Sequence, residues 1–403
     1  MSKSTFFTGQ PVFSQLLKFL PRHIINGCAR EYRSDLYYKK FNTHHHLITM
    51  LYACFQKCTS LREVVTGIRA CKGKLQPLGL RHFPCRSTLA DANKNRSYEV
   101  FEQLFYKLVE IFRKLYPDSR NLDPYIKRLI IIDSTTITLF KDILKGAGVK
   151  KANGKKKGGI KVHMAVRAKE DIPGFIKLSE AALADSQFMK YFNPEKGSII
   201  VMDKAYNWYK ELNRWKRDGA DWVTRIRVDA HIEVIKELHV SKESKSAGVL
   251  SDKLILMGRA NSKIEQVKCR LIEYYDETLN MNFKFITSSL KWTSKKVASI
   301  YKQRWQIETL FRRLKQNMPL EYFLGDNENA IKIQIYCALM SDLLLQIALK
   351  WIKRKWAYAN LSSFVRLHLM NYTHLNNFLN DPYNSKIYDP PPPNNQISLF
   401  LSG

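Results

Sequence analysis

The sequence predicts an α/β protein in which a mixed β-sheet in the middle of the chain is flanked by helical segments. Two short apolar runs rich in β-branched residues, Leu129–Ile132 and Ser198–Met202, are typical of buried central strands. An amphipathic stripe between Tyr98 and Leu115 predicts a long helix before the sheet. Helical patterns dominate again after Pro319. These observations together place the sheet between two helical parts.

An aspartate directly follows each of the two predicted central strands. These residues are Asp133 and Asp203. An acid at the end of a buried strand is expected at the rim of the sheet. Burying one carboxylate beside another is costly unless a cation neutralises them. Further strands are predicted at Thr135–Phe140, Ile160–Arg167, Phe175–Ala182 and Trp222–Arg227. The pattern therefore predicts two acids that converge at one edge of a mixed sheet.

A third acid lies in a segment where polar groups recur at helical spacing. Tyr301, Arg304, Glu308 and Lys315 stand at offsets of 0, 3, 7 and 14. On one continuous helix, which advances about 100° per residue, all four side chains would leave within an arc of about 60°. The apolar residues of a neighbouring helix face are Ile300, Ile307, Leu310, Phe311 and Leu314. Either this polar face only meets solvent, or it presents one acid among groups that bind phosphate.

Three converging acids without obvious cysteine or histidine partners favour a hard cation such as Mg²⁺ or Mn²⁺. We expect Asp133, Asp203 and Glu308 to be both the metal ligands and the catalytic residues. We interpret Asp185 instead as the N-cap of a short helix. A mixed sheet with acids on two strands and a third acid on a later helix describes an RNase H-like core.

The charge of the chain indicates a polyanionic partner. Among 403 residues, 66 Lys and Arg against 36 Asp and Glu give a formal net charge of +30. Nucleic acid fits this excess better than a membrane surface, because no basic amphipathic helix with a lipid-facing aromatic stripe is evident. The most apolar run, Ala338–Leu349, is too short to span a bilayer and contains Asp342, so we expect a core helix. Seven cysteines without framework spacing, and no recognisable signal peptide, indicate a cytosolic protein.

A lysine-rich stretch, Lys150–Gly159, lies between two predicted strands and contains Lys155, Lys156 and Lys157. It is either a solvated loop or a loop whose lysines bind DNA phosphates and release counterions. It lacks the Gly-Lys-Ser/Thr ending that a Walker loop requires.

The composition and the element pattern divide the chain into five parts. They are an N-terminal helical DNA-binding domain (1–122), the first part of the core (123–228), a β-rich insertion (229–285), the second part of the core with the glutamate helix (286–325), and a C-terminal helical region with a proline-rich tail (326–403). The first part is assigned to DNA because short helices joined by basic turns suit such a module, although a helical cap without DNA contact has the same pattern.

With Asp133, Asp203 and Glu308 in this order, and Tyr-x2-Arg-x3-Glu-x6-Lys around the glutamate, the chain resembles the DDE transposases of bacterial insertion sequences. The branch it resembles is named for this Tyr-Arg-Glu-Lys signature. The similarity spans about residues 125 to 325. An acid after an apolar strand is a weak motif by itself, whereas the full signature preceded by both acids is specific.

This resemblance implies an RNase H-like fold with a β-strand insertion, two divalent ions, and a homodimer that brings two transposon ends together. It implies cut-and-paste movement, often through a DNA hairpin at the transposon end. It also implies double-stranded DNA as the partner, and a bacterial protein of the cytoplasm and nucleoid. Tyr301, Arg304 and Lys315 would then hold phosphates beside the cleaved bond. Related enzymes hold a flipped base against an aromatic residue near the insertion, for which Phe283 or Trp292 is available here, unless Phe283 belongs to the core.

Two other functions fit the same residues. An RNase H-like nuclease would cut DNA in the presence of metal without joining the ends to a target. A catalytically silent relative would bind DNA and cleave nothing. The intact signature disfavours the first, and the three intact acids disfavour the second.

Overall fold

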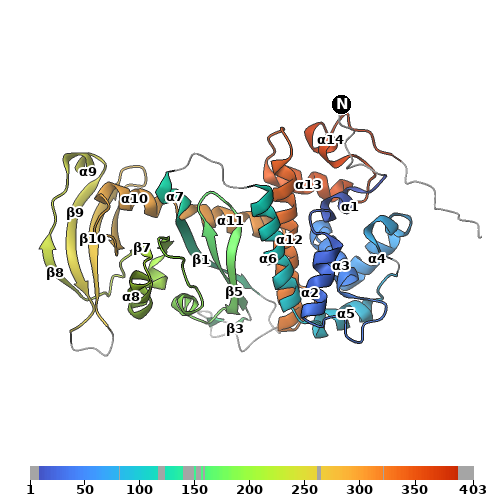
Figure 1. Ribbon diagram of the computed structural model, residues 1–403, viewed down its shortest axis with the longest axis horizontal. Helices are drawn as coiled ribbons and strands as arrows, with labels where there is room; N and C mark the ends of the chain where they lie inside the picture. The colour runs from blue at the N-terminus through green and yellow to red at the C-terminus, as the bar shows by residue number, and fades with distance from the viewer. Residues whose placement is uncertain are drawn as a thin grey trace, which may run out of the picture. The chain divides into compact units, whose positions relative to one another are not determined.

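The computed structural model describes residues 9–80, 82–116, 123–138, 149–150, 156–157, 159–260, 265–320 and 322–388. The chain forms two compact units. A helical unit combines Met1–Asp118 with Arg313–Gly403, and a sheet unit comprises Ser119–Arg312. The two helical segments that the sequence predicts at opposite ends of the chain therefore pack together as one unit (Figure 1).

The sheet unit is organised around nine strands in the order β5-β4-β1-β6-β7-β11-β10-β9-β8. Their bounds are β1 Leu129–Thr138, β4 Gly159–Arg167, β5 Pro173–Glu180, β6 Ile199–Met202, β7 Asp221–Arg225, β8 Ile232–Glu237, β9 Val249–Met257, β10 Val267–Asp276 and β11 Met281–Thr287. A separate pair, β2 Val149–Lys150 and β3 Lys156–Lys157, forms a short antiparallel ladder.

The first five strands in this order have the connectivity expected of an RNase H-like core. Strands β5, β4 and β1 are antiparallel neighbours, whereas β1, β6 and β7 run parallel to one another. The predicted fold class, an α/β protein with an RNase H-like core, is thus confirmed. The insertion does not form a separate layer: β11 pairs antiparallel with β7, so β10, β9 and β8 continue the same sheet (Figure 1).

Two details of the strands differ from the sequence prediction. The two strands predicted on either side of Asp133 are one, because β1 continues through this residue while it pairs with β4. Strand β8 was not predicted. All six of its residues are exposed, as befits a strand at the sheet edge, so no buried face leaves a signal in the sequence.

Helices of the sheet unit cover the sheet and close its core. Helix α8, Tyr209–Arg217, packs its Leu212 and Trp215 against Trp222 of β7 in one hydrophobic cluster. The indole nitrogen of Trp222 donates to the backbone oxygen of Leu212, at 3.1 Å. The other helices are α7 Pro124–Lys127, α9 Lys242–Ser246, α10 Ser294–Lys302 and α11 Trp305–Asn317, the last of which continues into the helical unit.

The prediction of a single helix from Tyr301 to Lys315 is wrong. Helix α10 ends at Lys302 and α11 begins at Trp305. Around the break, Gln303 and Arg304 donate backbone N–H groups to the carbonyls three residues earlier, as in a tight turn. The four signature residues therefore do not share one helix face, and the direction of Arg304 is set by the turn.

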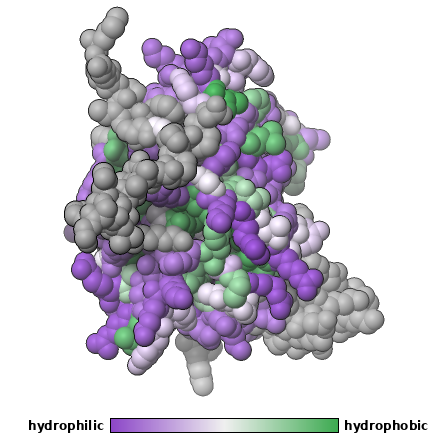
Figure 2. Space-filling model, turned by 90° about the vertical axis from the view of Figure 1, so that its right-hand side faces the viewer, coloured by the Kyte–Doolittle hydropathy of each residue, from purple (hydrophilic) through white to green (hydrophobic). Residues whose placement is uncertain are grey.

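The helical unit contains α1 Val12–Leu17, α2 Arg22–Glu31, α3 Thr43–Gln56, α4 Leu61–Ala70, α5 Arg86–Asn95, α6 Glu99–Leu115, α12 Glu328–Lys350, α13 Tyr358–His368 and α14 Leu375–Asn380. Helix α12 packs against α3 and α6 and forms the centre of the unit (Figure 1). By length and composition α12 resembles a membrane span, but 89% of its apolar window is buried inside the protein, as expected of a core helix. Figure 2 shows a mostly hydrophilic surface on the helical unit, with small hydrophobic patches.

Candidate active site

Two neighbouring parallel strands bring the first two acids together. The parallel pairing of β1 with β6 ends at Ile132 opposite Met202. Asp133 and Asp203 are the next residues on the two strands, so they lie side by side where the parallel ladder ends. Asp203 also caps the turn that follows, because its Oδ1 accepts the backbone N–H of Ala205 at 3.2 Å.

Arg304 joins the first acid to the third. Its Nη1 donates to Oδ2 of Asp133 at 2.9 Å, and its Nη2 donates to Oε1 of Glu308 at 2.6 Å. The guanidinium is buried, whereas the side chains of Asp133 and Glu308 keep 17% and 33% of their area exposed. One arginine thus holds two of the three predicted acids around a site that solvent can reach.

Burial and neighbouring charges make Asp133 harder to ionise. The pKa of Asp133 is raised to about 6, chiefly because burial removes water from the carboxylate. The neighbouring charges of Asp203 and Glu308 raise this pKa further, whereas Arg304 and the backbone N–H of Ser134 lower it. The charges of Asp203 and Glu308 therefore both act on Asp133, the acid that Arg304 also contacts.

The second acid has its own arginine, which the sequence did not single out. Arg225, at the end of β7, donates its Nη2 to Oδ2 of Asp203 at 2.8 Å. The sequence places Arg225 near the end of a predicted strand, which is a signal for the rim of the sheet. Nothing in the sequence distinguishes it from the other basic residues. Together Arg304 and Arg225 provide two positive charges to three carboxylates.

Tyr301 is buried and lies close to Arg304, whose guanidinium carbon is 6.0 Å from the centre of the tyrosine ring. Its ring packs on Phe285 with centroids 4.7 Å apart, and Phe285 stacks on Phe283 at 5.7 Å. Within the described residues, its hydroxyl has no hydrogen-bond partner. Burial raises the pKa of Tyr301, although the charges of Arg304 and Arg225 oppose the shift. The phenol is therefore neutral and free to donate one hydrogen bond.

Asp185 belongs to a polar network on β1 and β4, and the prediction that its side chain caps a helix is wrong. It does begin the 3₁₀ turn Asp185–Lys190, but without a side-chain capping bond. Instead, its Oδ1 accepts from Oγ of Ser134 at 2.7 Å and pairs with Nζ of Lys161 at 3.2 Å. His163 lies 3.9 Å from the same oxygen. Asp185, a fourth acid, thereby holds Ser134, the residue that follows Asp133 on β1.

The donor set around Asp133 fits a hard divalent cation. Three carboxylates offer only oxygen ligands, which Mg²⁺ and Mn²⁺ prefer. Across the described residues no group of three His, Cys, Asp or Glu side chains is arranged to hold an ion as it stands. The carboxylates of this site are paired with Arg304 and Arg225 instead. Burial is the main cause of the raised pKa of Asp133, and the charges of Asp203 and Glu308 add to it.

A basic pocket of about 410 Å³ lies beside the Asp203–Arg225 pair. Its lining residues are Lys204, Arg225, Ile226, Arg227, Val228, Ala230, Ile232, Leu271, Met281, Asn282, Phe283 and Lys284. Phe283 is partly exposed there, so it is not a core residue alone. Trp292 does not line this pocket, and its ring packs edge-on against Tyr125 instead. Of the two predicted aromatic residues, only Phe283 is placed to meet a ligand near the acids.

The predicted lysines are not part of this cluster as described. Lys315 is exposed on α11, about two turns beyond Glu308. Lys155 lies outside the described residues, and Lys156 and Lys157 are described only as the backbone of β3. Their role in binding DNA stays a prediction.

Comparison with known proteins points to one family. Residues 124–343 match the family described as "Transposase DDE domain", and residues 8–81 match a domain of unknown function, DUF4372. A protein of Sinorhizobium fredii named as a transposase, y4zB, is 30% identical over 270 residues, which cover 66% of this chain and 72% of that protein. A transposase-named protein of insertion sequence IS5377 from Geobacillus stearothermophilus is 24% identical over 70% of this chain and 72% of its own length. A solved structure of the piggyBac transposase synaptic complex with hairpin DNA aligns with a TM-score of 0.43 and 11% identity, over 95% of this chain and 84% of that one.

Proposed function

Because the chain belongs to the DDE transposase family, we propose that it binds the terminal inverted repeats of an insertion sequence, cleaves them and joins them to target DNA. The proposed enzyme is a homodimer that acts in the bacterial cytoplasm on double-stranded DNA. The formal charge of +30 supports a DNA partner.

One observation carries the proposal. Asp133 and Asp203 end the parallel ladder of β1 and β6 side by side, and Arg304 ties Asp133 to Glu308. These three acids lie inside the segment that matches the transposase domain. A carboxylate cluster at one end of a mixed sheet is what metal-assisted transfer of a phosphodiester needs.

Asp133, Asp203 and Glu308 would hold Mg²⁺ or Mn²⁺, and the family resemblance implies two ions. When bound, the ions would activate the attacking oxygen and stabilise the leaving oxygen. The remaining roles belong to the protein. Arg304 neutralises Asp133 and Glu308, and its fork geometry lets it exchange a carboxylate for a phosphate oxygen. The unpartnered hydroxyl of Tyr301 offers one further donor, as the signature resemblance implies.

Cleavage and strand transfer test the proposal together. Purified protein is incubated with Mg²⁺ and a duplex carrying the inverted repeats that flank its gene, with a target plasmid present. We expect cut ends and joined products from the native chain, and neither from Asp133→Ala, Asp203→Ala or Glu308→Ala. These variants should still bind the duplex.

The matched control is Asp218→Ala, which removes an exposed acid at the end of α8. It should cleave like the native chain. Full cleavage by any one of the three variants removes that acid from the site. Cut ends without joined products identify a nuclease, and binding without cutting identifies a silent relative.

The basic pocket beside Asp203 supports a second contact with the DNA end. Phe283 presents a partly exposed ring among Lys204, Arg225 and Lys284, so it can stack on an unpaired base while the cations meet phosphates. A fluorescent base analogue at the cleaved end should be quenched by the native chain. We expect Phe283→Ala to lose that quenching and Trp292→Ala to keep it. Equal quenching by both variants would end the assignment of Phe283.

A further inference from the structure

A second pocket, of about 440 Å³, lies within the N-terminal part of the helical unit. It is an open groove bordered by α1, the start of α2, the first half of α3 and the turn at Gly79. Its lining residues are Gln10, Ser14, Leu17, Lys18, Leu20, Pro21, Arg22, Ile25, His44, Ile48, Gln76, Pro77, Leu78 and Gly79. All of these residues fall in the matched domain of unknown function, and the comparisons assign the pocket no role.

The charges at this pocket all have one sign. Lys18 and Arg22 are exposed at its mouth, and none of the lining residues, all within the described chain, is acidic. Arg22 is also the first residue of α2, whose N-cap is Pro21 and makes no side-chain capping bond. The first N–H groups of a helix are open to an anion when no side chain caps them. A ten-residue helix therefore directs its positive end at a basic pocket.

A buried histidine supplies an independent sign of a missing ligand. His44 is 7% exposed, and within the described chain its Nδ1 has no hydrogen-bond partner. Burial, helped by the charge of Arg22, lowers the pKa of His44 to about 4. The ring is thus neutral at pH 7 and carries one N–H to donate. Leaving such a group unpaired is costly, so a partner is expected.

Gly79 keeps the space between the histidine and the arginine open. Its φ of +71° is a conformation that favours glycine. A Cβ at this position would lie 3.1 Å from Cε1 of His44 and 3.6 Å from Nη1 of Arg22. Both side chains therefore border the same small volume, which a side chain at residue 79 would fill.

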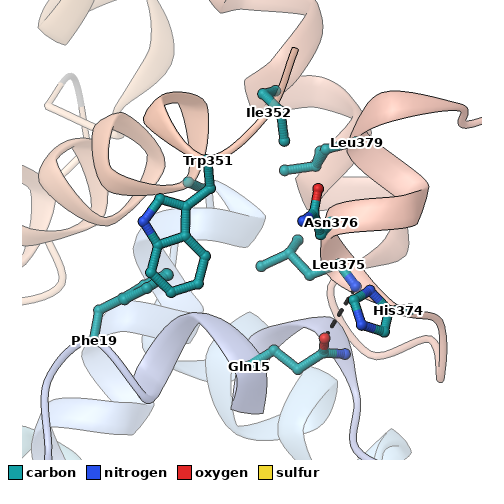
Figure 3. Close-up of a pocket in the computed structure, with 9 residues that line it drawn as sticks. Gln15, Phe19, Trp351, Ile352, His374, Leu375, Asn376 and Leu379 are labelled. Carbon is teal, nitrogen blue, oxygen red and sulfur yellow. Dashed lines mark hydrogen bonds between the residues drawn. The ribbon is translucent and has the colours of Figure 1, made fainter. Parts of the chain in front are cut away.

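The other pocket of the helical unit has a different chemistry (Figure 3). It is lined mainly by apolar groups, among them Phe19, Trp351 and Leu379. Its polar Gln15 is already engaged, because Oε1 accepts the backbone N–H of Leu375 at 3.0 Å. That pocket has no lysine or arginine among its lining residues, whereas the pocket at Arg22 has Lys18 and Arg22 among its own.

We propose that Lys18, Arg22, His44 and the start of α2 form a binding site for one phosphate of the DNA backbone. The inference rests on the proposed function, because it takes DNA to be the partner of the chain. The inference adds the place where the N-terminal helices contact the DNA duplex. A phosphodiester oxygen would receive the N–H groups of α2 and the N–H of His44, while Arg22 and Lys18 neutralise its charge.

The salt dependence of DNA binding tests the site in the full chain. Affinity for an inverted-repeat duplex is measured at several salt concentrations for the native chain, Arg22→Gln and Arg30→Gln. Arg30 is the matched control, because it is an exposed arginine in the last turn of the same helix and does not line the pocket. We expect Arg22→Gln to reduce the slope of log K against log salt by about 1 and Arg30→Gln to leave it unchanged.

A second variant keeps the test valid if Arg22→Gln perturbs the helix. His44→Phe preserves the ring volume and removes both nitrogens, and we expect affinity to fall about tenfold, which is the effect of one lost hydrogen bond to a charged group. Far-ultraviolet circular dichroism verifies the fold of both variants.

Each outcome decides one of two questions. Equal slopes for Arg22→Gln and Arg30→Gln, with DNA bound, overturn the phosphate site and leave the proposed function standing. Absence of DNA binding by the native chain overturns both. A third arm titrates inorganic phosphate by calorimetry: binding that needs Arg22, together with unchanged DNA slopes, identifies a site for a free anion and also overturns the DNA assignment.

Discussion

Replacing Asp133 with asparagine should make the metal-free protein more stable at neutral pH while it abolishes the proposed cleavage. The pKa of Asp133 is raised from 3.8 to about 6 in the folded chain. A group whose folded pKa is raised binds its proton more tightly when folded. The folded state therefore loses stability as pH rises from about 4 through about 6, and the full loss is present above that range.

The size of the effect follows from the shift. A pKa difference of about 2 units corresponds to roughly 3 kcal/mol, since one unit is about 1.4 kcal/mol. Because asparagine never ionises, Asp133→Asn should be more stable than the native chain by up to about 3 kcal/mol at pH 8. The difference should shrink to near zero at pH 4. Urea unfolding in buffer with a chelator, repeated across this pH range, measures it.

Asp229 provides a control with the opposite sign. It is exposed and its pKa is lowered by Arg227, which donates to both of its oxygens. Asp229→Asn should bring no gain in stability at high pH. If Asp133→Asn is instead less stable than the native chain at pH 8, the ion pair with Arg304 outweighs the cost of burial. The inference that the site lacks positive charge would then be incorrect.

Three further predictions concern residues of the sheet unit, two of them at the same site. Arg304→Gln removes the charge that lowers the pKa of Asp133, so the pH range over which stability falls should move upward, as measured by the same unfolding series. Asp252→Ala leaves the buried guanidinium of Arg270 without its carboxylate, and should cost about 3–5 kcal/mol in urea unfolding. Tyr301→Phe removes a buried hydroxyl without a partner in the described chain, so the unfolding free energy should stay equal or rise, and any fall in cleavage then reports a lost DNA contact.

The positions of the first two acids could be predicted because the signal is local. An apolar β-branched run followed by Asp133 or Asp203 marks a buried stretch of strand within five residues, although β1 itself continues past Asp133. The remaining step uses a general rule, since adjacent parallel strands end at the same edge. The parallel pairing of β1 with β6 satisfies that rule. That these acids perform the chemistry stays a prediction.

The groups that surround the acids could not be predicted, because they depend on contacts between distant residues. Arg304 reaches Asp133 across 171 positions, and Ser134 reaches Asp185 across 51. No periodicity records such a pairing. The same holds for the break before Trp305, since Gln303 and Arg304 are good helix formers and their sequence contains no proline or glycine.

The break has a consequence for how the acids are held. In an unbroken helix, Arg304 and Glu308 would lie one turn apart on the same face, and their ion pair would be the usual surface contact. The turn lets the same guanidinium also reach Asp133 on β1, so one side chain connects a helix to the sheet. Cleavage by a variant that forces α10 and α11 into one helix would show that this connection is dispensable.

The balance of charge fits the proposed role, in which the site is stable without a cation and binds one. Asp133, Asp203 and Glu308 carry three negative charges, and their direct partners Arg304 and Arg225 carry two positive charges, which leaves one negative charge uncompensated. Partial compensation reduces the repulsion among the acids, and the charges of Asp203 and Glu308 add to burial in raising the pKa of Asp133. Full compensation of the negative charges would remove the attraction for a divalent ion. A site without any compensation would make folding costly. The two arginines thus set the site between these limits.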